Sequence, residues 1–540
     1  MKTSSLNTVP QDRDSGPSPF TGARTTVPKM ALGTLLSRLT GLVRIFILTY
    51  ALGINHLSDS YNLANNTPNI IFDLVLGGIF SATLIPVFVE RLHLNRNGEP
   101  DRESVSAIVT VSAVILVLAS LFTFIFAPAI IDLYTTGTGG NQVAAVHQVS
   151  VVLLRCFAPQ IALYGLCSLI SALLNARSVF SPPMFVPIVN NLICIAMLGY
   201  VSVAFAHPSV AYAKGHLTFE LVLGLGTTLG VAAQLAMLYP YLRKLHLGLR
   251  WTWKLRNPAV RQVVSLSSWT LGFVIANQVT YFIVLALAVH SGRGGVTAYS
   301  TAFAFFQLPY GVAVVSIMSA VQPTMALSWS QRNLTRFKTR FLSGLSAING
   351  VVIPASVMMI VVAQPAIGFL LGHGSATVSS TLVISRTLVT FALGLPGFCW
   401  YLYLVRAFQT MQDTKTVFHL YLLENAINVF LAIFLVGPFG VEGLALSMSL
   451  AYTLAAIVGY AQLAIPLDGI GLASISRPLF RVITLSSIAG LISFISQSEI
   501  GSTSTFGMFE KLVVASVVAL AVLGAGVWLG LSRQLDSFNT

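Results

Sequence analysis

The sequence predicts an all-α polytopic membrane protein, with fourteen transmembrane helices arranged as two six-helix lobes in parallel repeat and a C-terminal pair. Composition, recurring apolar windows and the charges of the loops carry this prediction. Of the 540 residues, 55% are hydrophobic and only 9% charged, and the mean hydropathy is +0.81. These values lie far outside the range of soluble domains of similar length.

The apolar windows are long enough to cross about 30 Å of hydrocarbon, which is what a transmembrane helix requires. They begin near residues 30, 60, 104, 147, 182, 218, 263, 297, 341, 382, 416, 440, 478 and 509. Pro68 and Pro309 interrupt the second and the eighth helix.

The charges of the loops test this count independently, because cytoplasmic loops hold most of the Lys and Arg of a membrane protein. With the N-terminus in the cytoplasm, the outer loops hold only Lys214, Arg293 and Lys511. A miscounted helix would exchange inner and outer loops from that point on, and basic loops would no longer alternate with loops poor in Lys and Arg. We therefore expect residues 1–28 and 533–540 to be cytoplasmic tails. The net charge of +13 then reflects membrane topology, and no nucleic-acid partner is predicted.

A weak internal repeat divides the chain. Residues 59–68 resemble residues 299–309, and residues 174–191 resemble residues 409–425, with offsets of about 240 residues. Since six helices separate the partners, the two lobes should have the same orientation. Parallel lobes are typical of alternating-access transporters that hold substrate between them. The repeat predicts an N-lobe, a C-lobe and an additional pair of helices, at residues 29–250, 251–466 and 467–532.

No loop is long enough to form a catalytic domain, so an enzyme is not predicted. The longest loop, residues 243–261, is basic and contains Leu and Trp. It could be an amphipathic segment on the anionic inner leaflet or a solvated linker. The cysteines, Cys156, Cys167, Cys194 and Cys399, lie in apolar runs without ligand spacing, so neither a disulfide framework nor a metal site is supported.

Arg38 and Arg44 lie within the first predicted helix, about 9 Å apart along its axis. Ionisable groups at membrane depth are costly and usually face a wet cavity. We expect both to meet a ligand there, while snorkelling to the inner interface is the alternative for Arg38.

A polar stripe follows one face of the second helix, because its members are three or four residues apart. They are Asp59, Asn62, Asn66, Asn69 and Asp73. Asp73 lies deep and requires a partner, for which Arg44 and Arg155 are the candidates. Asp59 should lie near the outer end, where interfacial capping is its competing role.

Other polar residues at membrane depth extend this candidate site. Arg155 is either a cavity cation or part of a structural pair, whereas Arg386 and Arg406 are interpreted as interfacial. Gln307 precedes the proline of the eighth helix. Glu424, Asn425 and Asn428, with Asn277 and Gln278, could ligate Na⁺, carry a proton at Glu424, or form a buried hydrogen-bond network.

Several motifs together resemble the MurJ (MviN) family of bacterial lipid II flippases. They are Ser37-Arg38-x-x-Gly41-x-x-Arg44, Asp59, Pro68-Asn69, Gly78-x-Phe80-Ser81, Pro86-Val87-Phe88, Leu308-Pro309-Tyr310-Gly311 and Gln412-Asp413-Thr414-Lys415-Thr416. The resemblance covers about residues 30–532. It implies membership of the MOP exporter superfamily, a cationic central cavity, and a groove for a polyprenyl tail at the last two helices.

The resemblance also implies that Arg38 and Arg44 meet a lipid diphosphate. Members with an arginine triad carry arginine where this chain has Phe72 and Ala304. The cavity of this chain is therefore expected to be less cationic than that of the family, unless Arg155 compensates. Such divergence resembles the high-GC Gram-positive branch of the family.

The function expected is translocation of lipid II to the outer leaflet by alternating access, without a cofactor. The energy source could be Na⁺, H⁺ or the membrane potential. The alternatives are a multidrug or organic-cation antiporter and a flippase for another polyprenyl-linked glycan. A monomer in the bacterial cytoplasmic membrane is expected, with lipid II, membrane lipids and the cell-wall machinery as partners.

Overall fold

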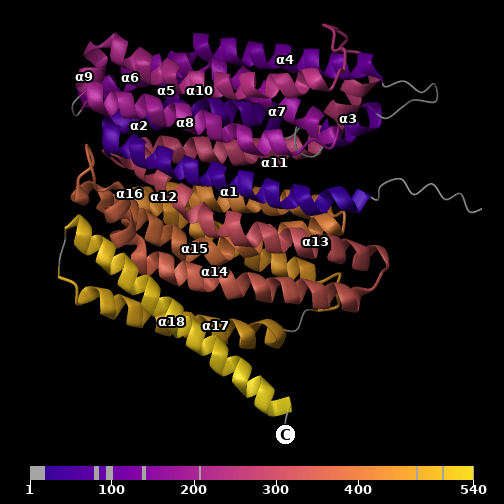
Figure 1. Ribbon diagram of the computed structural model, residues 1–540, viewed down its shortest axis with the longest axis vertical. Coiled ribbons are helices and arrows are strands. Elements are labelled where there is room, and N and C mark those ends of the chain that lie inside the picture. The colour runs from indigo at the N-terminus through magenta and orange to yellow at the C-terminus, as the bar shows by residue number, and fades with distance from the viewer. Residues whose placement is uncertain are drawn as a thin grey trace, which may run out of the picture.

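The computed structural model describes residues 19–77, 84–92, 101–136, 141–205, 208–469, 472–501 and 504–538. Every regular element within these ranges is a helix. Figure 1 shows two groups of helices, one above the other, with two further helices beneath them. The predicted all-α class with two lobes and a C-terminal pair is confirmed. The Gly78-x-Phe80-Ser81 part of the family motif lies outside the described residues.

The upper group in Figure 1 contains the first elements of the chain. They are α1 (Pro19–Leu52), α2 (His56–Phe72), η1 (Asp73–Gly77), α3 (Ile85–Leu92), α4 (Arg102–Ile125), α5 (Ala127–Thr135), α6 (Asn141–Phe157), α7 (Pro159–Ala176), α8 (Ser181–Ala204), α9 (Val210–Gly215) and α10 (Leu217–Lys244). We refer to this group as the N-lobe. Its helix α1 packs on α8 and borders the second lobe.

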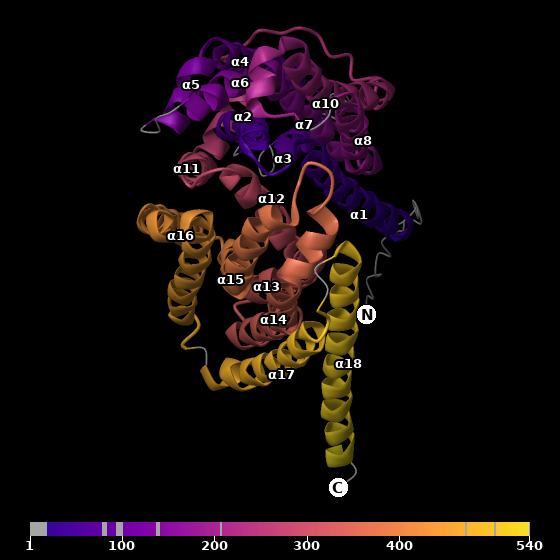
Figure 2. The same cartoon turned by 90° about the vertical axis from the view of Figure 1, so that its left-hand side faces the viewer.

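The C-lobe and the terminal pair follow. They are α11 (Pro258–His290), α12 (Gly295–Pro309), η3 (Tyr310–Val314), α13 (Val315–Ser330), α14 (Leu334–Leu371), α15 (Val378–Thr410) and α16 (Thr414–Ala464), then α17 (Leu472–Ser498) and α18 (Thr505–Phe538). Helices α17 and α18 cross each other and pack on α14 (Figures 1 and 2).

Twelve helices in the described part of the chain are long and apolar enough to cross a membrane. The α2–η1 segment is not among them, and α16 is one 51-residue element with a non-helical kink at Gly440. The predicted count includes a separate helix from about residue 60 and another from about residue 440. The number fourteen therefore stays a prediction.

The two helices that the sequence predicts to be interrupted by Pro68 and Pro309 have the same local structure. Pro68 lies within α2 and Pro309 ends α12, and each of these helices runs into a π-helical segment, η1 and η3. Proline lacks the N–H that an α-helix needs, and π-bulges often occur at functional sites. These segments therefore mark equivalent places in the two lobes.

Three loops meet at one end of the bundle, on the left in Figure 1, and we call this the closed end. They connect α1 to α2, α11 to α12, and α14 to α15. Ser375 N donates to Tyr50 O at 2.9 Å, and Ser375 Oγ donates to Ala51 O at 3.2 Å. Gly53 and Gly294 have positive φ and lie so close to the opposite loop that an added Cβ would clash.

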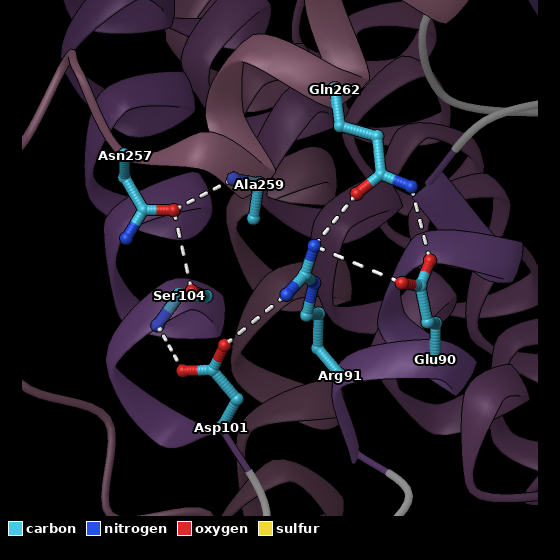
Figure 3. Close-up of polar contacts among 7 residues, drawn as sticks. All are labelled: Glu90, Arg91, Asp101, Ser104, Asn257, Ala259 and Gln262. Atoms are coloured by element: carbon cyan, nitrogen blue, oxygen red, sulfur yellow. Dashed lines mark hydrogen bonds and ion pairs between the residues drawn. The ribbon is translucent and has the colours of Figure 1, made fainter. Parts of the chain in front are cut away.

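The opposite end, where α1 begins and α18 ends, holds the linker from α10 to α11, and we call it the basic end. Figure 3 shows the start of α11 tied to α3 and α4 there. Arg91 Nη2 donates to Gln262 Oε1 at 2.9 Å, and Arg91 Nη1 lies 3.6 Å from Asp101 Oδ2. Asn257 caps α11 and also accepts from Ser104 Oγ at 3.3 Å.

The linker itself is not helical. Leu247 is buried, and the backbone N–H groups of Arg250 and Thr252 donate to Ser106 and Thr110 of α4. Trp251 and Trp253 remain exposed. The linker is therefore held against α4 with two aromatic rings facing outward, a pattern that suits a membrane interface.

Candidate functional site

Arg44 points from α1 into the N-lobe. Its guanidinium lies within electrostatic reach of Cys194 of α8, Tyr61 of α2 and Tyr164 of α7. No acid is paired with Arg44 among the described residues. A cation held by a thiol and two phenols keeps its charge free for an anionic ligand.

Arg38 points the other way, toward the C-lobe. Its guanidinium lies so close to Gly311 of η3 that a Cβ there would come within 2.7 Å of it. Tyr310 interacts electrostatically with both Arg38 and Arg406, the latter on α15. Arg406 also reaches Tyr421 of α16. Arg38 and Arg406 therefore have a common neighbour, Tyr310, although the sequence predicts Arg406 to be interfacial.

The N-terminal half of the α2 stripe joins the two lobes at the closed end. Asp59 is buried and accepts three hydrogen bonds, from Gly294 N at 2.7 Å and from Thr297 N and Oγ1, each at 2.9 Å. Asn62 donates to Thr297 Oγ1 at 3.1 Å, and Asn66 donates to Ser300 Oγ at 3.3 Å. An acid at a helix N-terminus satisfies donors that lack intrahelical partners. Asp59 therefore caps α12 across the lobe boundary.

The inner half of the stripe faces a cavity of about 500 Å³ in the N-lobe. Asn69, Phe72 and Asp73 line it together with Tyr164 and Asn175 of α7. Asn69 donates to Asn65 O of its own helix. Tyr164 therefore both lines the cavity and lies within electrostatic reach of Arg44.

The predicted partners of Asp73, Arg44 and Arg155, are both wrong. Asp73 Oδ2 accepts from Gln278 Nε2 of α11 at 3.2 Å. Gln278 is therefore directed toward the N-lobe. It points away from the cation site that the sequence predicts around Glu424. The reason is that α11 packs against η1 on one side and against α16 on another.

Arg155 lies beside an aromatic ring of α4. Its guanidinium lies 6.0 Å from the ring centroid of Phe124, an exposed residue of α4. Helix α4 lies at the edge of the N-lobe away from the C-lobe (Figure 2). The Arg155 guanidinium thus faces α4, and Arg155 is not among the described residues that line the N-lobe cavity with Phe72.

The second polar cluster lies inside the C-lobe. Asn425 Nδ2 donates to Asn277 Oδ1 at 2.6 Å, and Ser447 Oγ donates to Asn428 Oδ1 at 2.9 Å. Glu424 is buried and lies within electrostatic reach of tyrosines from three helices, Tyr299, Tyr401, Tyr421 and Tyr452. Four of the five predicted cation ligands are thus grouped in one lobe, with Gln278 outside the group.

The remaining positions to place are Gln307 and Ala304 on α12 and Phe72 at the end of α2. Gln307 is half-buried in the last turn before η3, and Ala304 is half-buried one turn earlier. Phe72 packs against Tyr164, with 6.4 Å between ring centroids. An aromatic pair therefore occupies the place where a guanidinium would extend into the N-lobe cavity.

Arg406 is exposed near the end of α15, as suits the predicted interfacial position, and it shares the neighbour Tyr310 with Arg38. A lone arginine near the end of a helix cannot be told from an interfacial anchor, because the sequence does not specify which side of the helix faces the cavity. Its neighbours Tyr310 and Tyr421 come from other helices. Only the tertiary structure brings these residues together.

The sequence profile described as "Lipid II flippase MurJ" matches residues 48–528. The chain belongs to the MurJ family. The "Probable lipid II flippase MurJ" of Borreliella burgdorferi is 24% identical over 498 residues, which cover 91% of this chain and 94% of that relative. The "Lipid II flippase MurJ" of Burkholderia cenocepacia is 25% identical, over 71% of this chain and 72% of the relative.

Solved structures agree on the fold. A MurJ lipid II flippase in an inward closed conformation matches this MurJ family member with a TM-score of 0.74 at 20% identity, over 93% of this chain and 99% of the other. An inward-facing multidrug MATE transporter of the MOP superfamily matches with a TM-score of 0.63 at 15% identity, over 81% and 98%. The shared fold is that of a membrane transporter with two lobes.

Proposed function

We propose that this MurJ family member translocates lipid II from the inner to the outer leaflet of the bacterial cytoplasmic membrane. The family match over residues 48–528 is the observation that carries the proposal. The arginines between the lobes support it, since a lipid diphosphate is an anionic ligand that guanidinium groups bind with charge-assisted hydrogen bonds. No bond is made or broken in such a transfer.

In this proposal the basic end is cytoplasmic, because Lys and Arg accumulate on that side of a membrane. The lipid diphosphate is bound between Arg44 of the N-lobe and Arg38 and Arg406 at the C-lobe boundary. The polyprenyl tail lies against α17 and α18. Release to the outer leaflet requires the hydrogen bonds between Asp59 and α12 to break, so the closed end is the outer gate.

Coupling to an energy source belongs to the same proposal. Cations at different depths respond to the membrane potential, with about 2.3 kcal/mol per charge per 100 mV. The Asn277–Asn425 pair and Glu424 could instead bind Na⁺ or a proton, since amide and carboxylate oxygens suit both. The chain is proposed to act as a monomer beside the cell-wall machinery, with the N-lobe at residues 29–250 and the C-lobe at residues 251–466.

One observation favours a second candidate, an antiporter for organic cations. The buried Glu424 lies among four tyrosines, and acids with aromatic rings bind organic cations. Cation efflux would depend on Glu424 and would be insensitive to loss of Arg44. A flippase for another polyprenyl-linked glycan would depend on Arg44 but would accept a different cargo.

The test is depletion of the protein in its native cell while lipid II is followed in each leaflet. We expect lipid II to accumulate in the inner leaflet and wall synthesis to stop. Normal outer-leaflet lipid II after depletion, in cells without a second flippase, would contradict the proposal. Vesicles containing the purified protein and either lipid II or another undecaprenyl-diphosphate glycan separate the two cargoes.

A further inference from the structure

A second polar pocket lies near the closed end, between the C-lobe and the C-terminal pair. Its volume is about 550 Å³, and α14, α15, α17 and α18 all contribute to its lining. Its polar lining residues are Gln364, Ser385, Arg386, Gln497, Ser498 and Lys511. None of them belongs to the site between the lobes.

Two cations from different helices meet in this pocket. Arg386 is 8 residues after the first residue of α15, and Lys511 is 6 residues after the first residue of α18, which places them about 12 and 9 Å below the helix starts. This is the depth of lipid headgroups and the first part of their chains. Neither forms an ion pair within the described ranges. The neighbouring acids Glu499 and Glu510 are exposed and do not line the pocket.

Gln497 adds a buried amide with unused hydrogen-bonding capacity. Its side chain is almost fully buried at 7% exposure, and Nε2 donates to Val361 O at 3.0 Å. Its Oε1 is buried and has no partner. Gln497 therefore forms a buried wall of the pocket that its hydrogen bond ties to α14.

Apart from Ser385 and Ser498, the rest of the pocket lining is apolar, and it includes exposed residues of α17. Phe494 lines the pocket and is 56% exposed, and Leu491, one turn earlier on the same helix, is 61% exposed. A hydrocarbon chain can lie along these residues while its headgroup reaches Arg386 and Lys511. The pocket therefore places two cations where a lipid phosphate lies and an apolar surface where its hydrocarbon chain lies.

We propose that this pocket binds the phosphate headgroup of a lipid in the leaflet at the closed end. If the proposed function holds, the occupant is the lipid-linked diphosphate after its transfer, and the pocket is a release site. A phospholipid of that leaflet presents the same phosphate. The chemistry recognised is an anionic phosphate with an adjacent hydrocarbon chain.

The experiment measures lipid binding to the purified full chain by native mass spectrometry. The probes are undecaprenyl phosphate and phosphatidylglycerol, each compared with its phosphate-free alcohol, undecaprenol or diacylglycerol. We expect Arg386→Gln and Lys511→Gln each to weaken binding of the phosphate-bearing probes about tenfold, and to leave the alcohols unchanged. Arg481→Gln, an exposed arginine on α17 in the half near the basic end, is the matched control.

Arg386→Lys keeps the charge and should retain binding, which separates loss of the site from loss of the fold. Tighter binding of undecaprenyl phosphate than of phosphatidylglycerol would identify the transported class of lipid as the occupant, and equal binding would identify a membrane phospholipid. Unchanged binding in the Arg386→Gln, Lys511→Gln double variant, or an equal loss in Arg481→Gln, would overturn the proposal. Failure of the unmodified protein to move lipid II would contradict the proposed function without altering this binding result.

Discussion

At the scale of single residues, the two arginines of α1 serve different lobes. Arg44 is held by Cys194, Tyr61 and Tyr164, whereas Arg38 approaches Gly311 across the lobe boundary. Six residues on a helix correspond to about 120° of rotation, so the two side chains leave α1 on different faces. A diphosphate bound by both would therefore bridge the N-lobe and the C-lobe.

Loss of Arg44 should abolish function without preventing folding. We expect Arg44→Ala to fail to complement depletion at unchanged protein level, because the N-lobe loses its cation toward the substrate. Arg155→Ala is the matched control, since it removes an arginine at membrane depth that faces Phe124. The measurement is growth of the depleted strain with quantitative blotting. Full growth with Arg44→Ala would remove it from the site.

Asp59 should control how often the closed end opens. Asp59→Ala leaves the N–H groups of Gly294 and Thr297 without their acceptor, which destabilises closure by about 1–3 kcal/mol. Labelling of Ser375→Cys by a membrane-impermeant maleimide should therefore become faster. The control is Asp132→Ala, an exposed acid whose partner His147 is in the same lobe. Equal labelling in both backgrounds would show that Asp59 does not stabilise closure.

At the scale of elements, close contacts between helices depend on small residues. Gly394 and Gly397 of α15 lie against Ser449 and Thr453 of α16, and a Cβ on Gly394 would come within 2.5 Å of the Ser449 Cα. Helices in membranes associate mainly through such packing. The α15–α16 contact is therefore a rigid part of the C-lobe, in contrast to the polar contact between α2 and α12.

Gly394→Ala should destabilise the C-lobe by about 1–3 kcal/mol, because the backbone of α16 must move to accommodate the methyl group. Gly350→Ala is the control, as nothing lies within 4 Å of its Cβ position on α14. Both substitutions gain helix propensity equally, so their difference reports the contact. Thermal unfolding of the purified variants measures it. A midpoint for Gly394→Ala at or above that of Gly350→Ala would contradict the expectation.

At the scale of the whole molecule, the two lobes meet through polar contacts at the closed end and through α11. Helix α11 is attached to α3 and α4 at the basic end by Arg91 and Gln262, and packs on α16 further along. Hydrogen bonds between lobes can exchange partners at lower cost than an apolar core can repack. The closed end is therefore suited to reversible opening.

A covalent link across the closed end should stop transport. Ser375 N and Tyr50 O are 2.9 Å apart, so a Tyr50→Cys, Ser375→Cys pair lies close enough for a disulfide. We expect oxidation to block lipid II transfer in vesicles and a reductant to restore it. Each single cysteine variant serves as the control. Transfer that continues after complete cross-linking would show that the closed end does not open during transport.

The sequence by itself determined the class of the protein, the positions of most helices and the polar face of α2. Apolar length, three-to-four-residue spacing and the cost of charge in hydrocarbon act within one helix, so they can be read without the fold. The spacing of the stripe also anticipated that Asp59, Asn62 and Asn66 act together, and the structure brings all three to the N-terminal half of α12.

The tertiary structure alone decided the partners of these groups. Asp73 binds Gln278 instead of an arginine, Arg155 contacts Phe124, and Arg406 joins Arg38 through Tyr310. Each outcome depends on which face of a helix meets which neighbour, and that is set by packing between segments hundreds of residues apart. A single helix specifies the angle between its own side chains, but the position of its partner is determined by the rest of the fold.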